Sequence, residues 1–268
     1  MPTPAPDVAV IGGSGFATFL TEAEPVAVET PYGAPSAEVH VGEVDGREVA
    51  FLPRHGPGHR FPAHRINYRA NLWALRSLGV RRVLAPCAVG SLTPELGPGS
   101  LVVPDQLVDR TTHRVQTYFD EGACHVGFAD PYCPDLRRTV LDVVATQGQE
   151  ATDGGAMVVI EGPRFSTRAE SQWYAAQGWS LVNMTGHPEA VLARELAMCY
   201  AAIALVTDVD AGLDASQAVD QASVFAVFER NIERLRALLA RAVAEVPAQA
   251  DCGCTRVHDG MALPVELP

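Results

Sequence analysis

An apolar run followed at once by two acidic residues is the feature that most constrains this chain. Residues 201–206 are all apolar, which is typical of a strand buried on both faces of a sheet, and Asp208 and Asp210 follow directly. Burying two carboxylates at a strand end costs free energy unless protons or hydrogen bonds compensate. A capped strand end or surface turn is the alternative if this run is taken alone. With the clusters described below, we expect a functional site here.

Strand and helix patterns alternate along the rest of the chain. Further strands are predicted at residues 8–11, 49–52, 82–85, 99–104, 155–160 and 180–184. Helices are predicted at residues 67–78, 136–144, 170–176, 188–197 and 225–243, with 109–134 as a long irregular segment. This alternation predicts an α/β fold. We expect one domain over residues 1–268, with a core of about 8–246 and an irregular tail at 247–268.

Composition narrows the class of protein. The chain has 268 residues, 47% hydrophobic and 19% charged, which is ordinary for a soluble globular protein. A formal charge of −12 argues against a nucleic-acid partner, because phosphate backbones require a basic face. We find no run of about 18 apolar residues and no signal-peptide pattern, so we expect no membrane association and a cytoplasmic location.

The spacing of the cysteines indicates no clear disulfide framework. Cys87, Cys124, Cys133 and Cys199 are scattered, and we expect them to be reduced thiols. Cys252 and Cys254 are separated by one glycine and could form a strained disulfide, although two unpaired tail thiols are the favoured interpretation.

Polar residues follow the first two predicted strands. A glycine-rich turn around Ser14 follows residues 8–11, and it is either an anion loop or a plain strand-ending turn. Arg54 and His55 follow residues 49–52 and supply donors suited to an oxyanion. His55, His59 and His64 match no zinc pattern, so we expect no metal site.

If these clusters converge, their chemistry suits cleavage of an N-glycosidic bond. Ser14, Arg54, His55 and Thr185 would hold one phosphate, and Met184 offers a surface for a sugar. A carboxyl at Asp208 would share or deliver a proton as a purine leaves, and phosphate would attack the oxocarbenium-like sugar from its opposite face.

Ordered motifs along the chain strengthen this interpretation. They are Ile11-Gly12-Gly13-Ser14-Gly15, Arg54-His55-Gly56, Asn67-Tyr68-Arg69-Ala70-Asn71, Asp109-Arg110-Thr111-Thr112, Glu161-Gly162-Pro163-Arg164-Phe165, Asn183-Met184-Thr185 and Pro188-Glu189. The series resembles the trimeric purine nucleoside phosphorylase family, in its 5′-methylthioadenosine phosphorylase branch, over residues 8–246. The resemblance implies a homotrimer of α/β subunits, each with a mixed central sheet flanked by helices, that needs no cofactor and uses inorganic phosphate as co-substrate.

The resemblance also implies roles for individual residues. The implied phosphate ligands are Ser14, Arg54, His55, Cys87, Ala88 and Thr185. The implied nucleoside contacts are Phe165, Ser166, Asn183, Met184, Asp208, Asp210, Val219, Val224 and, reaching into a neighbouring subunit's site, His125. Asp208 is the implied catalytic residue. Cys87 stands where relatives often have threonine. Gly186 and His187 replace a Thr-Val pair that is frequent in this branch, and we expect a histidine beside the sugar site to alter its preference.

Several functions remain open. The leading one is phosphorolysis of S-methyl-5′-thioadenosine to adenine and 5-methylthioribose 1-phosphate, since carboxylates at Asp208 and Asp210 accept from a 6-amino purine. The nearest alternatives are a phosphorylase of 5′-methylthioinosine, of 6-oxopurine nucleosides, or of other 5′-modified adenosines such as 5′-halo compounds. A nucleoside hydrolase and a non-catalytic nucleoside-binding protein are further alternatives.

Overall fold

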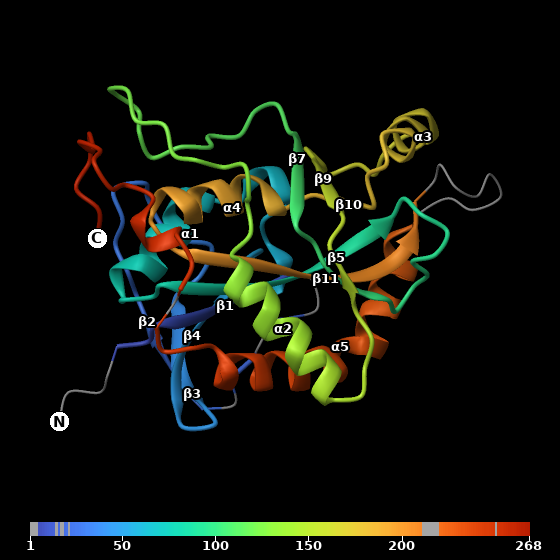
Figure 1. The fold of residues 1–268 in the computed structure, drawn as a ribbon, viewed down its shortest axis with the longest axis horizontal. Helices are drawn as coiled ribbons and strands as arrows, with labels where there is room; N and C mark the ends of the chain where they lie inside the picture. Colours follow the sequence, from blue (N-terminus) through green and yellow to red (C-terminus); the bar gives the residue numbers. More distant parts are fainter. Residues whose placement is uncertain (1–4, 14–15, 17–18, 21, 211–219, 250) are drawn as a thin grey trace.

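A mixed sheet of 11 strands runs through the computed structural model, which describes residues 5–13, 16, 19–20, 22–210, 220–249 and 251–268. The strands are β1 (Val8–Gly12), β2 (Ala23–Val26), β3 (Val39–Val44), β4 (Arg47–Pro53), β5 (Arg82–Ser91), β6 (Leu101–Val103), β7 (Gln106–Arg110), β8 (Thr152–Asp153), β9 (Ala156–Ile160), β10 (Leu181–Asn183) and β11 (Cys199–Val209). The helices are α1 (Tyr68–Ser77), α2 (Pro134–Thr146), α3 (Arg168–Ala176), α4 (Gly186–Glu195) and α5 (Gln221–Glu245). The predicted α/β fold with a mixed sheet flanked by helices is confirmed (Figure 1).

Strand β5 organises the sheet because it has three neighbours. β1 and β11 run parallel to it, while β10 pairs with its last two residues in the antiparallel direction. Ser91, the last residue of β5, therefore lies beside both Leu181 of β10 and Val209 of β11. Since β10 then runs back along β5, its end at Asn183 returns to Ala88, whose carbonyl accepts a hydrogen bond from Asn183 Nδ2 at 3.0 Å. The end of β11 and the end of β10 are thus brought to the same region.

Helices cover both faces of the sheet (Figure 1). α1 and α4 bury side chains such as Leu72 and Leu192 in one apolar cluster, and α2 and α5 bury Leu136 and Leu239 in another. The predicted amphipathic helix at 225–243 is confirmed as part of α5, whose buried residues recur every three or four positions. Among the described residues, none of the helices combines the length and apolarity needed to cross a membrane.

The start of α3 shows how local sequence sets an element that borders the site. Thr167 caps the helix and forms a reciprocal pair of hydrogen bonds with Glu170. Arg164 adds an ion pair to Glu170 at 2.7 Å. The segment between β9 and α3, which carries Phe165 and Ser166, is therefore fixed at its helical end.

Some elements differ from the prediction. β2 and β3 form an antiparallel edge beyond β4 that the apolar pattern did not reveal, because β2 exposes its middle residues and β3 is only partly buried. β7 occupies the start of the segment predicted to be irregular, and residues 111–133 after it have no helix or strand.

The tail after residue 247 is irregular but it is not a loose extension. Cys252 and Cys254 are buried, and Val265 and Leu267 pack against the core. Asp135 at the start of α2 accepts hydrogen bonds from the backbone N–H groups of residues 251 and 252, each at 2.9 Å. The tail therefore returns to the body of the domain.

Candidate active site

One cavity of about 340 Å³ collects most of the residues singled out in the sequence. The predicted residues that line it are Arg54, His55, Cys87, Ala88, Phe165, Ser166, Asn183, Met184, Thr185, Asp208, Asp210 and Val224. They come from the segments after β4 and β9, from β5, β10 and β11, and from the start of α5. Its volume lies in the range of small-molecule sites. The segment with Arg54 and His55 and the acidic end of β11 thus open onto the same space.

Arg54 is buried at the floor of this cavity and is only 1% exposed. Its Nε and Nη2 donate to both carboxylate oxygens of Glu189 at 2.7 and 2.8 Å, and Glu189 is fully buried. Nη1 and Nη2 also donate to the carbonyls of Pro86 and Ile11. These bonds use four of the five N–H groups of the guanidinium. Arg54 is therefore a neutralised structural cation with little donor capacity left for an anion.

Gly13 permits this arrangement of Arg54. A Cβ at Gly13 would lie 2.7 Å from Arg54 Nη1 and 3.1 Å from the carbonyl oxygen of Pro86. Any side chain at Gly13 would displace the guanidinium from its carbonyl acceptor, so the glycine-rich turn supports the floor of the cavity directly.

His55 differs from the donor that we expected. Its Nδ1 lies 2.8 Å from the carbonyl oxygen of Phe61, which can only accept, so Nδ1 carries the proton. Burial, with smaller effects of His59 and Arg54, lowers the pKa of His55 to about 3. The ring is then neutral at physiological pH and its Nε2 carries a lone pair. In this state His55 offers the cavity a hydrogen-bond acceptor, where the sequence had suggested a donor.

Three polar groups line the neighbouring wall. Burial raises the pKa of Cys87 to about 12, so its side chain stays a thiol, which is a weak donor. Asn183 Oδ1 accepts from the backbone N–H groups of Thr185 and Gly186, each at 2.7 Å. Asn183 therefore shapes the turn into α4, which holds the Thr185 side chain at the cavity.

Asp208 also lines the cavity, next to an irregularity in β11. The register between β11 and β5 shifts between Val206 and Asp208, where Thr207 is the extra residue. Such a bulge redirects the side chains that follow it. Thr207 Oγ1 donates to Asp208 Oδ2 at 2.8 Å. Burial, together with Asp210, raises the pKa of Asp208 to about 6 despite this hydrogen bond.

Asp210 is more deeply placed than Asp208. It is 2% exposed, and its Oδ2 accepts a hydrogen bond from Ser171 Oγ on α3 at 2.5 Å. A Cβ at Gly90 of β5 would lie 3.0 Å from Asp208 Oδ1 and 3.5 Å from the Asp210 Cβ. The two carboxylates are thus packed against a position of β5 that has no side chain.

Less polar side chains complete the lining of the cavity. Met184 lies against Gly162, where a Cβ would approach Met184 Sδ to 2.7 Å and where the backbone has a φ of +67°. Phe165 is 37% exposed at the cavity wall. The Oγ of Ser166 is buried and has no hydrogen-bond partner among the described residues. An aromatic ring and an unpaired hydroxyl beside a cavity suit a flat, polar-edged ligand.

Comparison with known proteins agrees with this geometry. A family model described as the phosphorylase superfamily matches residues 7–244. This chain belongs to the phosphorylase superfamily. It is 63% identical over 260 residues to an S-methyl-5′-thioadenosine phosphorylase of Mycolicibacterium smegmatis, covering 97% of this chain and 98% of that one. It is 55% identical over 273 residues to a purine nucleoside phosphorylase of Streptomyces coelicolor, covering 98% of each.

A solved structure of the superfamily has the same fold. The methylthioadenosine phosphorylase from Schistosoma mansoni in complex with adenine is 35% identical and superimposes with a TM-score of 0.89. The match covers 94% of this chain and 95% of that chain.

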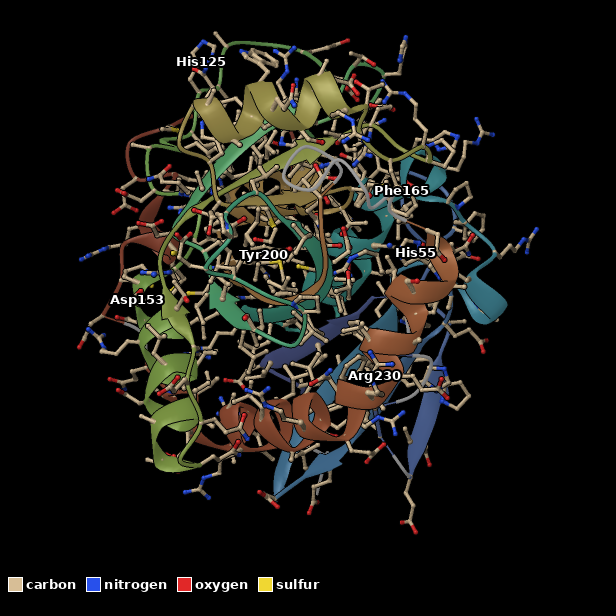
Figure 2. The ribbon with its side chains drawn as sticks, turned by 90° about the vertical axis from the view of Figure 1, so that its right-hand side faces the viewer. His55, His125, Asp153, Phe165, Tyr200 and Arg230 are labelled. Carbon is tan, nitrogen blue, oxygen red and sulfur yellow. The ribbon has the colours of Figure 1, made fainter. Side chains whose placement is uncertain are left out.

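Not every predicted site residue lines this cavity. His125 is exposed on the irregular segment after β7, and Figure 2 shows it at the top of the molecule, apart from His55 and Phe165. His187 is buried elsewhere, with its Nε2 facing Gln116 at 2.7 Å and Asp109 at 3.2 Å, so its expected position beside the sugar site was wrong. Ser14 and Val219 lie outside the described residues.

The structure adds residues that the sequence reasoning missed in this phosphorylase. His59 stacks on His55 with ring centroids 3.9 Å apart. Phe225 contacts the His59 ring edge-on, with centroids 6.2 Å apart. Both line the cavity, as does Thr207. We had weighed His59 only as a metal ligand. The short separation of His59 from His55 in the chain could have indicated contact. The stacking depends on a left-handed backbone at His59 (φ 57°), which residue patterns do not predict.

We predict that breaking the buried ion pair of Arg54 on one side destabilises the protein strongly. Glu189→Gln leaves Arg54 buried and uncompensated, which should lower the free energy of unfolding by about 3–5 kcal/mol. Tyr200→Phe is the matched control, because it removes only the 2.7 Å hydrogen bond to the Glu189 carboxylate and should cost about 1.5–3 kcal/mol. Urea unfolding at a fixed protein concentration measures both, and equal losses in the two variants would contradict the prediction.

Proposed function

We propose that this protein splits S-methyl-5′-thioadenosine with inorganic phosphate, forming adenine and 5-methylthioribose 1-phosphate. The observation that carries this proposal is a single cavity lined both by oxyanion-compatible groups and by Asp208 with Asp210. The names of the Mycolicibacterium smegmatis relative and of the Schistosoma mansoni structure support the substrate.

We assign phosphate binding mainly to hydroxyl and backbone amide donors, and less to an unpaired cationic side chain. Arg54 is already paired with Glu189, so it polarises the floor of the cavity while Thr185 and the backbone at Ala88 face the anion. The lone pair on His55 Nε2 would accept the hydrogen of a monohydrogen phosphate. Cys87 contributes a weak thiol donor where a hydroxyl would bind more firmly, and Ser14 would add a donor from the glycine-rich turn.

At the purine end, Asp208 would act as the proton donor. Its raised pKa of about 6 keeps a proton available near neutral pH. As the bond between C1′ and N9 breaks, its electron pair passes to the purine and the Asp208 proton goes to N7. A phosphate oxygen forms the new bond to C1′. Asp210, held by Ser171, would accept from the 6-amino group.

The pocket for the 5′ substituent would be formed by Val224, Phe225 and His59. Their surfaces are mostly apolar, which favours a methylthio group over a hydroxyl. A hydrophobic pocket separates such small groups by only about 1–3 kcal/mol. Other 5′-modified adenosines, including 5′-halo compounds, should therefore react at lower efficiency. Val219 is assigned to the same pocket on the resemblance alone.

A second candidate is phosphorolysis of 6-oxopurine nucleosides or 5′-methylthioinosine. The Streptomyces coelicolor relative at 55% identity is named a purine nucleoside phosphorylase, which favours this candidate. A protonated Asp208 could also donate to a 6-oxo group or N7. Asp210 distinguishes the two, because a second carboxylate suits a 6-amino donor better.

We also propose a homotrimer in which His125 reaches the cavity of a neighbouring subunit. The exposure of His125 and its distance from its own cavity support this arrangement (Figure 2). We propose that the enzyme works in the cytoplasm, needs no cofactor besides phosphate as co-substrate, and does not bind nucleic acid or membranes. The charge of −12 supports the absence of a nucleic-acid partner.

A substrate panel with and without phosphate tests the proposed reaction. We expect release of adenine from S-methyl-5′-thioadenosine only when phosphate is present, with adenosine slower and inosine slower still. Base release measured by chromatography gives the ratio of kcat/KM values. Turnover without phosphate would identify a hydrolase, faster turnover of inosine would select the second candidate, and tight binding with no base release would indicate a binding protein.

We predict that Thr185→Val weakens phosphate use selectively. The substitution removes one hydroxyl donor at nearly constant volume, so KM for phosphate should rise by about tenfold, in line with a hydrogen bond to a charged group. KM for the nucleoside should change much less. Initial rates at varied phosphate measure both constants, and an unchanged KM for phosphate would remove Thr185 from the anion site.

We predict that Asp208→Asn lowers kcat/KM for S-methyl-5′-thioadenosine by about 10²–10⁴-fold and shifts preference toward 6-oxo bases. Because the folded pKa of Asp208 is raised to about 6, the proton is present below that pH and is lost above it. At saturating phosphate, the wild-type kcat/KM should therefore fall more steeply between pH 6 and 8 than that of the variant. Asp142→Asn, on an exposed position of α2, is the control. Parallel pH profiles would refute the role.

A further inference from the structure

Four cysteines that are far apart in the sequence meet in one place. They are Cys133 immediately before α2, Cys199 at the start of β11, and Cys252 and Cys254 in the tail. Their Sγ atoms all lie within 4.8 Å of one another, and all four residues are buried. The expected unpaired thiols are confirmed, since all six cysteines are free, but nothing in their sequence positions indicated that four of them meet.

The spacing of the sulfur atoms fits a tetrahedral metal centre. In a structural zinc site, four thiolates bind at about 2.3 Å, which separates the sulfur atoms by roughly 3.8 Å. Cys199 Sγ and Cys252 Sγ are 3.4 Å apart, and the other pairs lie within the 4.8 Å limit. Small adjustments of the side chains would bring all four sulfur atoms to that separation.

We propose that Cys133, Cys199, Cys252 and Cys254 form a tetrathiolate site for Zn²⁺ that fastens the tail to the domain. Binding would release four thiol protons and form four Zn–S bonds, so no oxidant is required. All four positions of the tetrahedron would be filled by protein, which is the pattern of a structural site and leaves none for a substrate.

Backbone contacts hold the four cysteines in place independently of a metal. The N–H of Cys133 donates to the Tyr200 carbonyl and that of Cys199 donates to the Arg81 carbonyl, each at 2.8 Å. The N–H of Cys252 donates to Asp135 Oδ2 at 2.9 Å. Cys254 begins a short 3₁₀ turn that spans Cys254–Arg256. The thiols are thus presented to a common centre by a strand, a helix start and a turn.

Two disulfides are the chemical alternative for these four thiols. Disulfides join sulfur atoms in pairs at about 2.05 Å and give no reason for the two pairs to converge on one centre. They would also require removal of four electrons by an external oxidant. A thiophilic cation uses all four sulfur atoms at once, which matches the mutual closeness of the cluster.

The site lies at the opposite end of β11 from Asp208. The strand runs from Cys199 to Val209, which corresponds to roughly 30 Å at the usual rise per residue. A metal here would act on the stability of the tail and of the start of β11, and it would not take part in the proposed phosphorolysis. The two proposals therefore succeed or fail separately.

Metal analysis of the full-length protein tests the proposal. Purified under reducing conditions without chelators, it should contain about one zinc per chain by mass spectrometry of metals. Cys252→Ser and Cys254→Ser should lose the zinc and lower the melting temperature. Cys124→Ser, which changes a cysteine outside the cluster, should keep both at the wild-type level.

Cobalt binding by the wild-type protein keeps the test decisive if the cluster variants fail to fold. Metal-free reduced protein titrated with Co²⁺ should give the intense thiolate charge-transfer and tetrahedral d–d absorption bands, saturating at one Co²⁺ per chain. Absence of zinc together with absence of these bands would overturn the proposal. A non-reduced mass showing loss of four hydrogens, without bound metal, would establish disulfides instead.

Discussion

The buried pair of Arg54 and Glu189 is the interaction on which the site depends. Arg54 follows β4, Glu189 lies in α4, and Tyr200 of β11 donates to the same carboxylate. Arg54 also reaches the carbonyls at the end of β1 and in β5. The ion pair, with Tyr200 bonded to its carboxylate, therefore ties four strands and a helix together beneath the cavity. A charge so buried persists only because every partner is present, which makes the floor of the cavity rigid.

A rigid cavity floor keeps hydrogen-bonding groups at fixed positions. Such groups would let a chain with a net charge of −12 bind an anion. The guanidinium is already neutralised, and His55 is held as a neutral acceptor by its bond to Phe61. An oxyanion would then depend on directional hydrogen bonds rather than on an excess of positive charge. Elsewhere in the cavity, burial and the neighbouring Asp210 raise the pKa of Asp208 to about 6. Burial thus lowers the pKa of His55 and raises the pKa of Asp208, so it favours the neutral form of both side chains.

The cysteine cluster lies at the start of β11, the end of the strand that is remote from the cavity. That strand begins at Cys199, beside the tail, and ends at Asp208 and Asp210, beside the cavity. Its central residues are fully buried between helices on both faces. Fixing the start of β11 through the tail would help to fix the frame that carries the acidic end, although the two sites are chemically independent.

The sequence by itself determined the alternation of strands and helices, the amphipathic α5 and the pairing of polar clusters with strand ends, because periodicity is a local property. It also placed most of the lining residues in one family pattern. The tertiary structure alone decided that Arg54 is paired with Glu189, that His55 accepts rather than donates, that His187 faces Asp109, and that Cys133 and Cys199 meet Cys252 and Cys254. These facts depend on contacts between residues up to 135 positions apart, and no local pattern encodes which partner a buried polar group will find.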